Sequence, residues 1–253
     1  MTRINLYFAT LLFFLTLTGE LSYGIDNFSK VSSSFQLASD DFNFDADGKT
    51  RPGNRQGAAS RGSGNCPSMQ PPLTALIPQT NLGLTTKEYP TFWFYVPYNS
   101  TDIRQAELII LDKNRRPALE EPISVQLSGT PGIIGITLPS TAKPLELEQE
   151  YRWFFELECG SDDALNNPKV NGWIKRVQSS QNQNSQLQNN LTQEANIVDA
   201  NNSIWYDTLT DTLQKMRVNP TNSTLTNNWS DLLKSVELQE FVDTSITDCC
   251  SVK

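Results

Sequence analysis

Large apolar residues occupy every second position between Tyr151 and Leu157, and this alternation constrains the fold more than any other feature of the sequence. Residues 144–159 read PLELEQEYRWFFELEC. Successive side chains of a strand point to opposite faces, so one face carries Tyr151, Trp153, Phe155 and Leu157. The other face carries Arg152, Phe154, Glu156 and Glu158. We therefore predict a strand with one buried face and one mostly exposed face, as in a sheet that packs against a second sheet.

Tyr151 stands at the start of this predicted strand, shortly after Leu145 and Leu147. In immunoglobulin-like sandwiches, a tyrosine at the corresponding place bonds through its hydroxyl to the backbone of the preceding turn. The position of Tyr151 therefore predicts such a tyrosine corner.

Six other short runs between Leu73 and Val177 are apolar or alternating, and proline, glycine or asparagine separates them. They read LTALIP, TFWFYVP, AELIILD, PISVQL, GIIGITLP and VNGWIKRV. Strands at a spacing of about 10 residues with turn residues between them are typical of all-β sandwiches. We predict that residues 66–178 form an immunoglobulin-like or fibronectin III-like β-sandwich of about seven strands.

Trp93 and Tyr95 lie in the run TFWFYVP, in which both faces are aromatic or apolar. We interpret this run as a central strand that is covered on both sides. The alternative is that Trp93 and Tyr95 form an aromatic platform that binds sugars.

The periodicity changes to a helical one in residues 179–253. Near-helical spacing separates Ile204, Leu209, Leu213 and Met216, and Asn219-Pro220 ends the run. Leu225, Trp229, Leu232 and Val236 repeat the pattern. These stripes predict a C-terminal helical hairpin whose apolar faces pack on the sandwich.

Residues 1–24 have the pattern of a secretory signal peptide. Arg3 is followed by an apolar run of about 12 residues, which is too short to cross a hydrocarbon core of about 30 Å. A retained membrane anchor is the alternative. After cleavage we expect no membrane span and a secreted protein of the periplasm or cell surface.

Residues 25–65 are polar and rich in serine, glycine and aspartate, so we predict a disordered leader. Within it, Asn43, Asp45, Asp47 and Gly48 imitate the first half of a calcium loop. Asn54 stands where such a loop needs a bidentate glutamate, which favours a solvated acidic turn instead. The arginines and Lys49 of this leader could also touch an anionic envelope polymer, although a flexible linker is favoured.

The chain contains no histidine and its net charge is −8. The absence of histidine excludes Ser-His-Asp and Cys-His catalysis as well as zinc sites built on imidazole. The acidic balance argues against nucleic acid as a partner. We accordingly expect no catalytic residues, no cofactor and no bound metal.

Four cysteines in a chain bound for an oxidising compartment are disulfide candidates: Cys66, Cys159, Cys249 and Cys250. A bond between the adjacent Cys249 and Cys250 would close a strained ring, which makes it the most disfavoured pairing. We favour a bond between Cys66, which leads into the first predicted strand, and Cys159, which ends the central one.

Six motifs together resemble a cyanobacterial family known as domain of unknown function 928. They are LTALIP (73–78), PTFWFYVPY (90–98), PGIIGITLP (131–139), YRWFFELEC (151–159), GWIKRV (172–177) and SIWYDTL (203–209). The resemblance covers about residues 66–249 and implies a secreted, envelope-associated protein of cyanobacterial type. It implies no activity and no site residues.

Three classes of function follow from these features. We favour a non-catalytic binding module of the cell envelope, with an envelope protein or polysaccharide as its partner. A structural envelope component without a small ligand is the first alternative. A carboxylate-dependent hydrolase is the second. If the adjacent Glu120 and Glu121 lie in a strand, they point to opposite faces and cannot flank one substrate atom.

Overall fold

The computed structural model describes residues 44–57, 66–160, 167–179 and 204–252. The predicted signal peptide (1–24) and much of the predicted leader lie outside the described residues. The strands are β1 (Thr74–Ala75), β2 (Leu82–Thr85), β3 (Thr91–Val96), β4 (Gln105–Leu111), β5 (Ile123–Gln126), β6 (Gly132–Thr137), β7 (Glu150–Glu158), β8 (Lys169–Arg176) and β9 (Ser251–Val252). The helices are α2 (Trp205–Val218) and α3 (Ser223–Ser235), and short 3₁₀ helices span Ser100–Asp102 (η2) and Gln239–Phe241 (η5).

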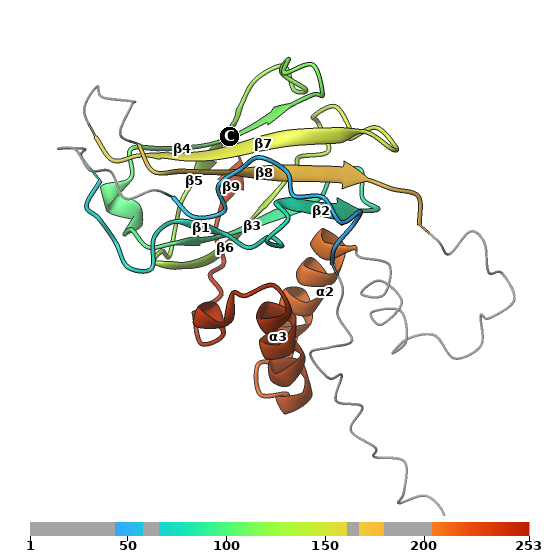
Figure 1. Cartoon of the computed structure of the whole chain (residues 1–253). Helices are drawn as coiled ribbons and strands as arrows, with labels where there is room; N and C mark the ends of the chain where they lie inside the picture. Colours follow the sequence, from blue (N-terminus) through green and yellow to red (C-terminus); the bar gives the residue numbers. More distant parts are fainter. Residues whose placement is uncertain (1–43, 58–65, 161–166, 180–203, 253) are drawn as a thin grey trace, which may run out of the picture. The chain divides into compact units, whose positions relative to one another are not determined.

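The strands form two sheets (Figure 1). One is antiparallel with the order β1-β3-β6, and the other has the order β2-β8-β7-β4-β5-β9, with β2 parallel to β8. Each of the seven runs predicted from the sequence contains a strand. The strands β2 and β9 were not predicted because they are short, with four and two residues. The protein is therefore mainly β, with two C-terminal helices.

The alternation in β7 is confirmed on its inner face, where Tyr151, Trp153, Phe155 and Leu157 are all buried. The opposite face is half-buried, not mainly exposed as predicted. The reason is that side chains on this face, from β7 itself and from the adjacent strand β8, partly cover one another. The Arg152 guanidinium lies 4.8 Å from the ring centre of Phe154 and 5.8 Å from that of Trp173.

Aromatic rings from both sheets fill the space between them. Phe94 of β3 stacks on Phe155 of β7 with ring centres 4.3 Å apart, and it meets the ring of Trp153 edge to face at 5.6 Å. Phe92 contacts Trp153 in the same way at 6.0 Å. Edge-to-face and offset contacts of this kind stabilise a core beyond the area that they bury.

The predicted bond of Tyr151 is present. Its hydroxyl accepts a hydrogen bond from the backbone N–H of Glu146, five residues earlier, at 2.9 Å. Tyr151 thereby fastens the start of β7 to the turn that precedes it.

The first turn of α2 inserts two aromatic residues against the sheets. The Trp205 indole donates to the carbonyl of Leu76 at 2.8 Å, and the Tyr206 hydroxyl accepts from the Trp153 indole at 2.8 Å. Gly83 of β2 makes this approach feasible, because a Cβ at that position would lie 2.6 Å from the Tyr206 ring. The helix is thus joined directly to the aromatic core.

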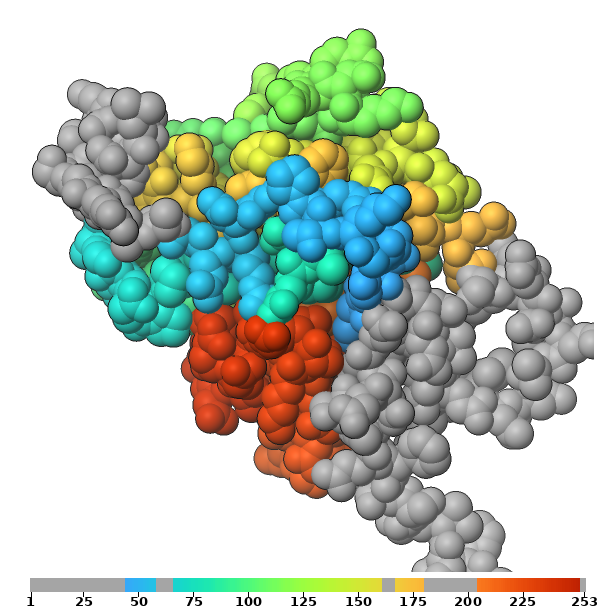
Figure 2. All heavy atoms as spheres, viewed as in Figure 1, coloured from blue at the N-terminus to red at the C-terminus, as the bar shows by residue number. Residues whose placement is uncertain are grey.

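Residues 44–57, which we call the N-terminal strap, lie against the folded domain (Figure 2). The strap's Asn54 carbonyl accepts from Asn171 of β8 at 2.9 Å, and its Arg55 carbonyl accepts from Ala75 of β1 at 2.7 Å. Because β8 and β1 belong to different sheets, the strap bridges the two sheets at one edge.

Side chains add to this attachment. Phe44 is buried and meets the Trp205 ring edge to face at 4.8 Å. Arg55 donates to the carbonyls of Val236 and Glu237, at 2.6 and 2.9 Å, at the end of α3. The prediction of a disordered leader over 25–65 is therefore wrong for residues 44–57.

Candidate functional site

The structure contains the favoured disulfide, between Cys66 and Cys159, with their Cα atoms 5.1 Å apart. It also contains the pairing that the sequence argument disfavoured, between Cys249 and Cys250. The ring strain on which that argument rested is accommodated by the backbone, because Cys250 adopts a φ of +127°. The prediction against an adjacent bond is wrong.

Trp93 and Tyr95 do not form an open aromatic platform. Both point to the outer side of the three-stranded sheet, and the C-terminal helices cover that side. The buried Trp93 indole donates to Thr210 of α2 at 3.0 Å, and the ring of Tyr95 lies 4.8 Å from that of Phe241 in η5. The alternative of a sugar-binding platform is therefore wrong, and β3 is covered on both sides as the sequence indicated.

Asn43 of the calcium-loop pattern lies outside the described residues, and the other three residues, Asp45, Asp47 and Gly48, form a turn. The carboxylate of Asp45 accepts from the Gly48 backbone N–H at 2.7 Å, and that of Asp47 pairs with Arg51 at 2.7 Å. Arg51 donates to Glu150 of β7 as well, at 2.9 Å. Within the part of the chain that the structure describes, no group of three acidic, cysteine or histidine side chains is placed to hold a metal ion.

Two connections between strands meet at one end of the sheets and enclose a hollow surface. The first, residues 112–122, joins β4 to β5 and begins with a tight turn. Asp112 accepts from the backbone N–H groups of Asn114 and Arg116, at 2.7 and 2.9 Å, which fixes that turn. Arg115 takes the left-handed conformation there, with a φ of +61°.

The second connection, residues 138–149, joins β6 to β7. Its Leu145 is buried, and the Leu145 carbonyl accepts from the Arg176 guanidinium at 2.8 Å. Together with the bond from Glu146 to Tyr151, this contact holds the connection in one position relative to the sheet. The second connection is therefore fixed by hydrogen bonds to the sheet, and the first is shaped by hydrogen bonds within its own turn.

We call this surface the loop trough. It consists of two adjoining hollows of about 360 and 660 Å³. The two share Pro117, Ala118, Leu119 and Lys143 on their walls. Asp112, Glu146 and Glu150 line the first hollow, and Glu120 and Glu121 line the second. Prolines and leucines thus lie among charged groups along the trough.

The carboxylates of the first hollow each have a cationic partner. Asp112 pairs with Arg116 at 3.3 Å, Glu146 with Lys143 at 2.6 Å, and Glu150 with Arg51. The pKa of the Asp112 carboxyl lies below its ordinary value, chiefly because the Arg116 backbone N–H donates to it. The pKa of the Lys143 ammonium lies above its ordinary value because of Glu146. The Asp112 carboxylate and the Lys143 ammonium therefore stay ionised at neutral pH, which suits recognition of a polar ligand better than proton transfer.

Glu120 and Glu121 lie in a bend of the connection between β4 and β5, not in a strand. Both are exposed at the second hollow. The sequence argument that placed them on opposite faces of a strand therefore does not apply to them.

Sequence reasoning did not find the loop trough. Its only indication in the sequence is the set of prolines at the ends of the strand runs: Pro122, Pro139 and Pro144. Prolines there mark where strands stop, but they do not indicate which two connections share an end of the fold.

Comparisons with known proteins place the chain in a family without identifying its activity. No curated protein and no solved structure matches it. A family model matches residues 56–246, which include β1 to β8, both helices and both connections of the trough. The chain belongs to the family described as Domain of Unknown Function (DUF928).

Proposed function

We propose that this protein is a non-catalytic binding module of the bacterial cell envelope, of cyanobacterial type, and that it binds an envelope protein or polysaccharide in the loop trough. The observation that carries the proposal is the trough itself. It is a hollow surface whose connections are shaped by hydrogen bonds, in which apolar groups lie beside paired charges. A preformed surface of this composition binds a ligand without losing much conformational freedom.

The arrangement of strands supports an immunoglobulin-like sandwich, which would agree with such a role. A small sheet, β1-β3-β6, faces a larger one in which β7 is central and β2 runs parallel to β8 at the edge. Tyr151 makes the bond expected of a tyrosine corner at the start of β7. Connections at the ends of such sandwiches are common binding sites, because they vary while the sheets hold them in place.

A place outside the cytoplasm is supported by the cysteines. Both pairs form disulfides in the structure, and disulfides persist mainly in oxidising compartments. The apolar run after Arg3 remains the basis for predicting secretion. No helix in the described parts of the chain combines the length and the apolar character needed to cross a bilayer.

The test compares the intact chain with two charge-reversal variants, Lys143→Glu and Lys234→Glu. The two lysines are matched, because each is exposed on its surface and pairs with a carboxylate three residues away, Glu146 and Asp231 respectively. Only Lys143 lines the trough. Binding to isolated envelope polysaccharide and to solubilised envelope proteins is measured by titration calorimetry and pull-down.

We expect Lys143→Glu to weaken binding at least tenfold, whereas Lys234→Glu leaves it unchanged. Equal effects of the two variants would show that the trough is not the binding surface. Absence of binding to either fraction would favour a structural envelope component without a small ligand. Hydrolysis of the polysaccharide during the titration would favour the carboxylate-dependent hydrolase.

A further inference from the structure

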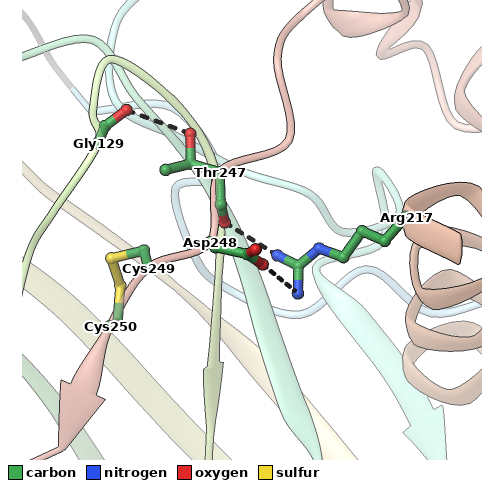
Figure 3. The surroundings of a disulfide bond; sticks show 6 residues. All are labelled: Gly129, Arg217, Thr247, Asp248, Cys249 and Cys250. Atoms are coloured by element: carbon green, nitrogen blue, oxygen red, sulfur yellow. Dashed lines mark hydrogen bonds and ion pairs between the residues drawn. A yellow bond between two sulfur atoms is a disulfide. The ribbon is translucent and has the colours of Figure 1, made fainter. Parts of the chain in front are cut away.

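Residues 245–252, which we call the C-terminal strap, connect the two sheets at a second edge. Ile133 of β6 donates its backbone N–H to Ser245 at 2.9 Å and accepts from Thr247 at 2.8 Å. Further along, β9 pairs with β5, so that Val252 lies opposite Val125 and Ser251 opposite Gln126. Because β6 and β5 belong to different sheets, the strap crosses from one to the other. Cys249 and Cys250 occupy the crossing point (Figure 3).

The part of the strap before the disulfide is held by several contacts. Arg217 of α2 donates to the Thr247 carbonyl at 2.9 Å and pairs with the Asp248 carboxylate at 3.2 Å (Figure 3). The Thr247 hydroxyl donates to the Gly129 carbonyl at 3.3 Å. Gly132 allows the close approach of the strap, because a Cβ there would lie 2.9 Å from the Ser245 carbonyl oxygen.

The part after the disulfide has a much smaller attachment. Its described contact with the sheets is the two-residue pairing of β9 with β5. A pairing of two residues contributes few backbone hydrogen bonds, each worth about 1 kcal/mol net. The pairing of β9 with β5 therefore depends on the backbone conformation of the residues that precede β9. The disulfide stands at the boundary between the fixed part of the strap and the weakly held part.

The two disulfides differ in what they can contribute to stability. The Cys66–Cys159 bond closes a loop with a sequence separation of 93 residues, whereas Cys249–Cys250 joins neighbours. In the chain-entropy account, a disulfide stabilises by restricting the unfolded chain, and the effect grows with the length of the loop. A bond between adjacent residues restricts almost nothing in the unfolded chain. Its consequence is local, on the backbone that it joins.

Cys250, the second residue of this bond, has a φ of +127°. Residues with a Cβ rarely adopt such a conformation, and they do so only where their surroundings impose it. Without the bond, Cys250 is free to return to a negative φ. The direction of the chain into β9 then changes, and the alignment of Ser251 and Val252 with β5 is lost.

The two bonds also differ in access. Cys66 is buried, with 8% of its surface exposed, and its partner Cys159 is half-buried, whereas Cys249 and Cys250 are both half-buried. Exchange requires a thiolate to reach one sulfur of the bond. An incoming thiol can therefore attack either sulfur of the C-terminal pair, but only the Cys159 sulfur of the other bond.

We propose that Cys249–Cys250 is a site of thiol–disulfide exchange, and that its redox state decides whether β9 pairs with β5. The reductant is a dithiol, either a small molecule or a dithiol protein. One of its thiolates attacks a sulfur of the bond and forms a mixed disulfide, with release of the other cysteine as a thiolate. The second thiol of the reductant then displaces the remaining cysteine. The protein gains two electrons and two protons, and the reductant leaves as a disulfide.

Reduction changes a surface as well as a bond. When β9 leaves, the outer edge of β5 (Ile123–Gln126) presents unpaired backbone groups, and such an edge accepts another extended chain. Exchange with the disulfide form of the same reductant reverses the step and restores β9, because the two thiols remain neighbours in the sequence. The fixed part of the strap, up to Asp248, stays in place in both states.

The first experiment measures the two bonds separately in the full, oxidised chain. The protein is titrated with dithiothreitol, quenched with iodoacetamide and analysed by peptide mass mapping. We expect Cys249 and Cys250 to be alkylated at least ten times faster than Cys66 and Cys159. Equal rates for the two pairs would overturn the proposal, as would free thiols at Cys249 and Cys250 in the oxidised protein.

The second experiment measures hydrogen exchange in the oxidised chain and in a C249S/C250S variant, which keeps the Cys66–Cys159 bond. We expect exchange in the peptide that contains Val125 and Gln126 to become at least tenfold faster in the variant. The Ile133 amide, which bonds to Ser245, serves as the internal control and should keep its protection. Unchanged exchange in β5, or loss of protection at Ile133, would overturn the proposal. If the variant fails to fold, the selectively reduced native chain replaces it.

Discussion

Trp153 offers the most direct test of the arrangement of the core. Its side chain is fully buried, contacts the rings of Phe92 and Phe94, and donates to the Tyr206 hydroxyl. Replacement of a buried tryptophan by alanine removes about 3 to 5 kcal/mol from the free energy of unfolding. Loss of the hydrogen bond to Tyr206 adds about 1 kcal/mol. Burial raises the pKa of the Tyr206 hydroxyl, so this bond is not altered by titration at any ordinary assay pH.

Trp173 on the neighbouring strand β8 is the matched control. It lies directly opposite Arg152 on the outer face of the same sheet and is only half-buried, and its indole bonds to the Pro52 carbonyl at 3.0 Å. We expect Trp173→Ala to lower the free energy of unfolding by about 1.5 kcal/mol, in line with partial burial. The two variants thus remove the same side chain from the two faces of one sheet.

The assay is urea unfolding followed by circular dichroism, with thermal unfolding as a second measurement. For a chain of this size, a loss of about 5 kcal/mol in Trp153→Ala corresponds to a decrease of about 10 to 20 °C in the melting temperature. Trp173→Ala should lower it by less than half as much. Equal effects of the two substitutions would refute the assignment of the faces, because a shift of one residue in register exchanges them.

Three further predictions concern the contacts between distant segments. Arg55→Ala should lower the free energy of unfolding by about 1 to 3 kcal/mol, since it leaves carbonyls at the end of α3 without their donor. As the control in the same urea assay, Arg104→Ala breaks an exposed ion pair and should lower the free energy of unfolding by less than about 1 kcal/mol. The pKa of the Asp47 carboxyl lies below its ordinary value of 3.8 because Arg51 donates to it, so the contribution of Asp47 to stability is present above that value and is lost as the pH falls through the lowered pKa. Asp47→Asn should therefore reduce the fall in the free energy of unfolding at acid pH, and an unchanged dependence of that free energy on pH would contradict the prediction. A chain that ends at Val177 should aggregate, because it uncovers Trp93 and Tyr95 on the outer side of β3; light scattering that shows a stable monomer would contradict the integration of the helices with the sheets.

The strands were predictable because side-chain patterns reveal which face of a strand is buried. The alternation from Tyr151 to Leu157 identified the inner face of β7, and the position of Tyr151 indicated its bond to the preceding turn. The aromatic residues on both faces of β3 likewise indicated that both faces are covered. The larger sheet covers one face and the C-terminal helices cover the other. In each case the relevant information lies within one short run of residues.

The loop trough was not predictable by the same means. Its walls come from two connections that are separated in the sequence by β5 and β6, and they adjoin only because of the order of the strands in the sheets. The charges that line it, such as Lys143 and Glu146, are typical of any solvated loop. Periodicity is a property of a single element, so it carries no information about which loops meet.

The N-terminal strap shows why composition misled the sequence argument. Composition measures how much apolar surface a segment can bury, and residues 44–57 can bury little apart from Phe44. The strap is held instead by backbone bonds to β1 and β8 and by the guanidinium groups of Arg51 and Arg55. The C-terminal strap is held in the same way, by backbone bonds to Ile133 and by Arg217. Two sheets whose edges are left open need such partners for their unpaired backbone groups, and any polar segment with a suitable cation can provide them. Polar segments that flank a predicted sandwich are therefore candidates for its edges, and their arginines are the residues to substitute first.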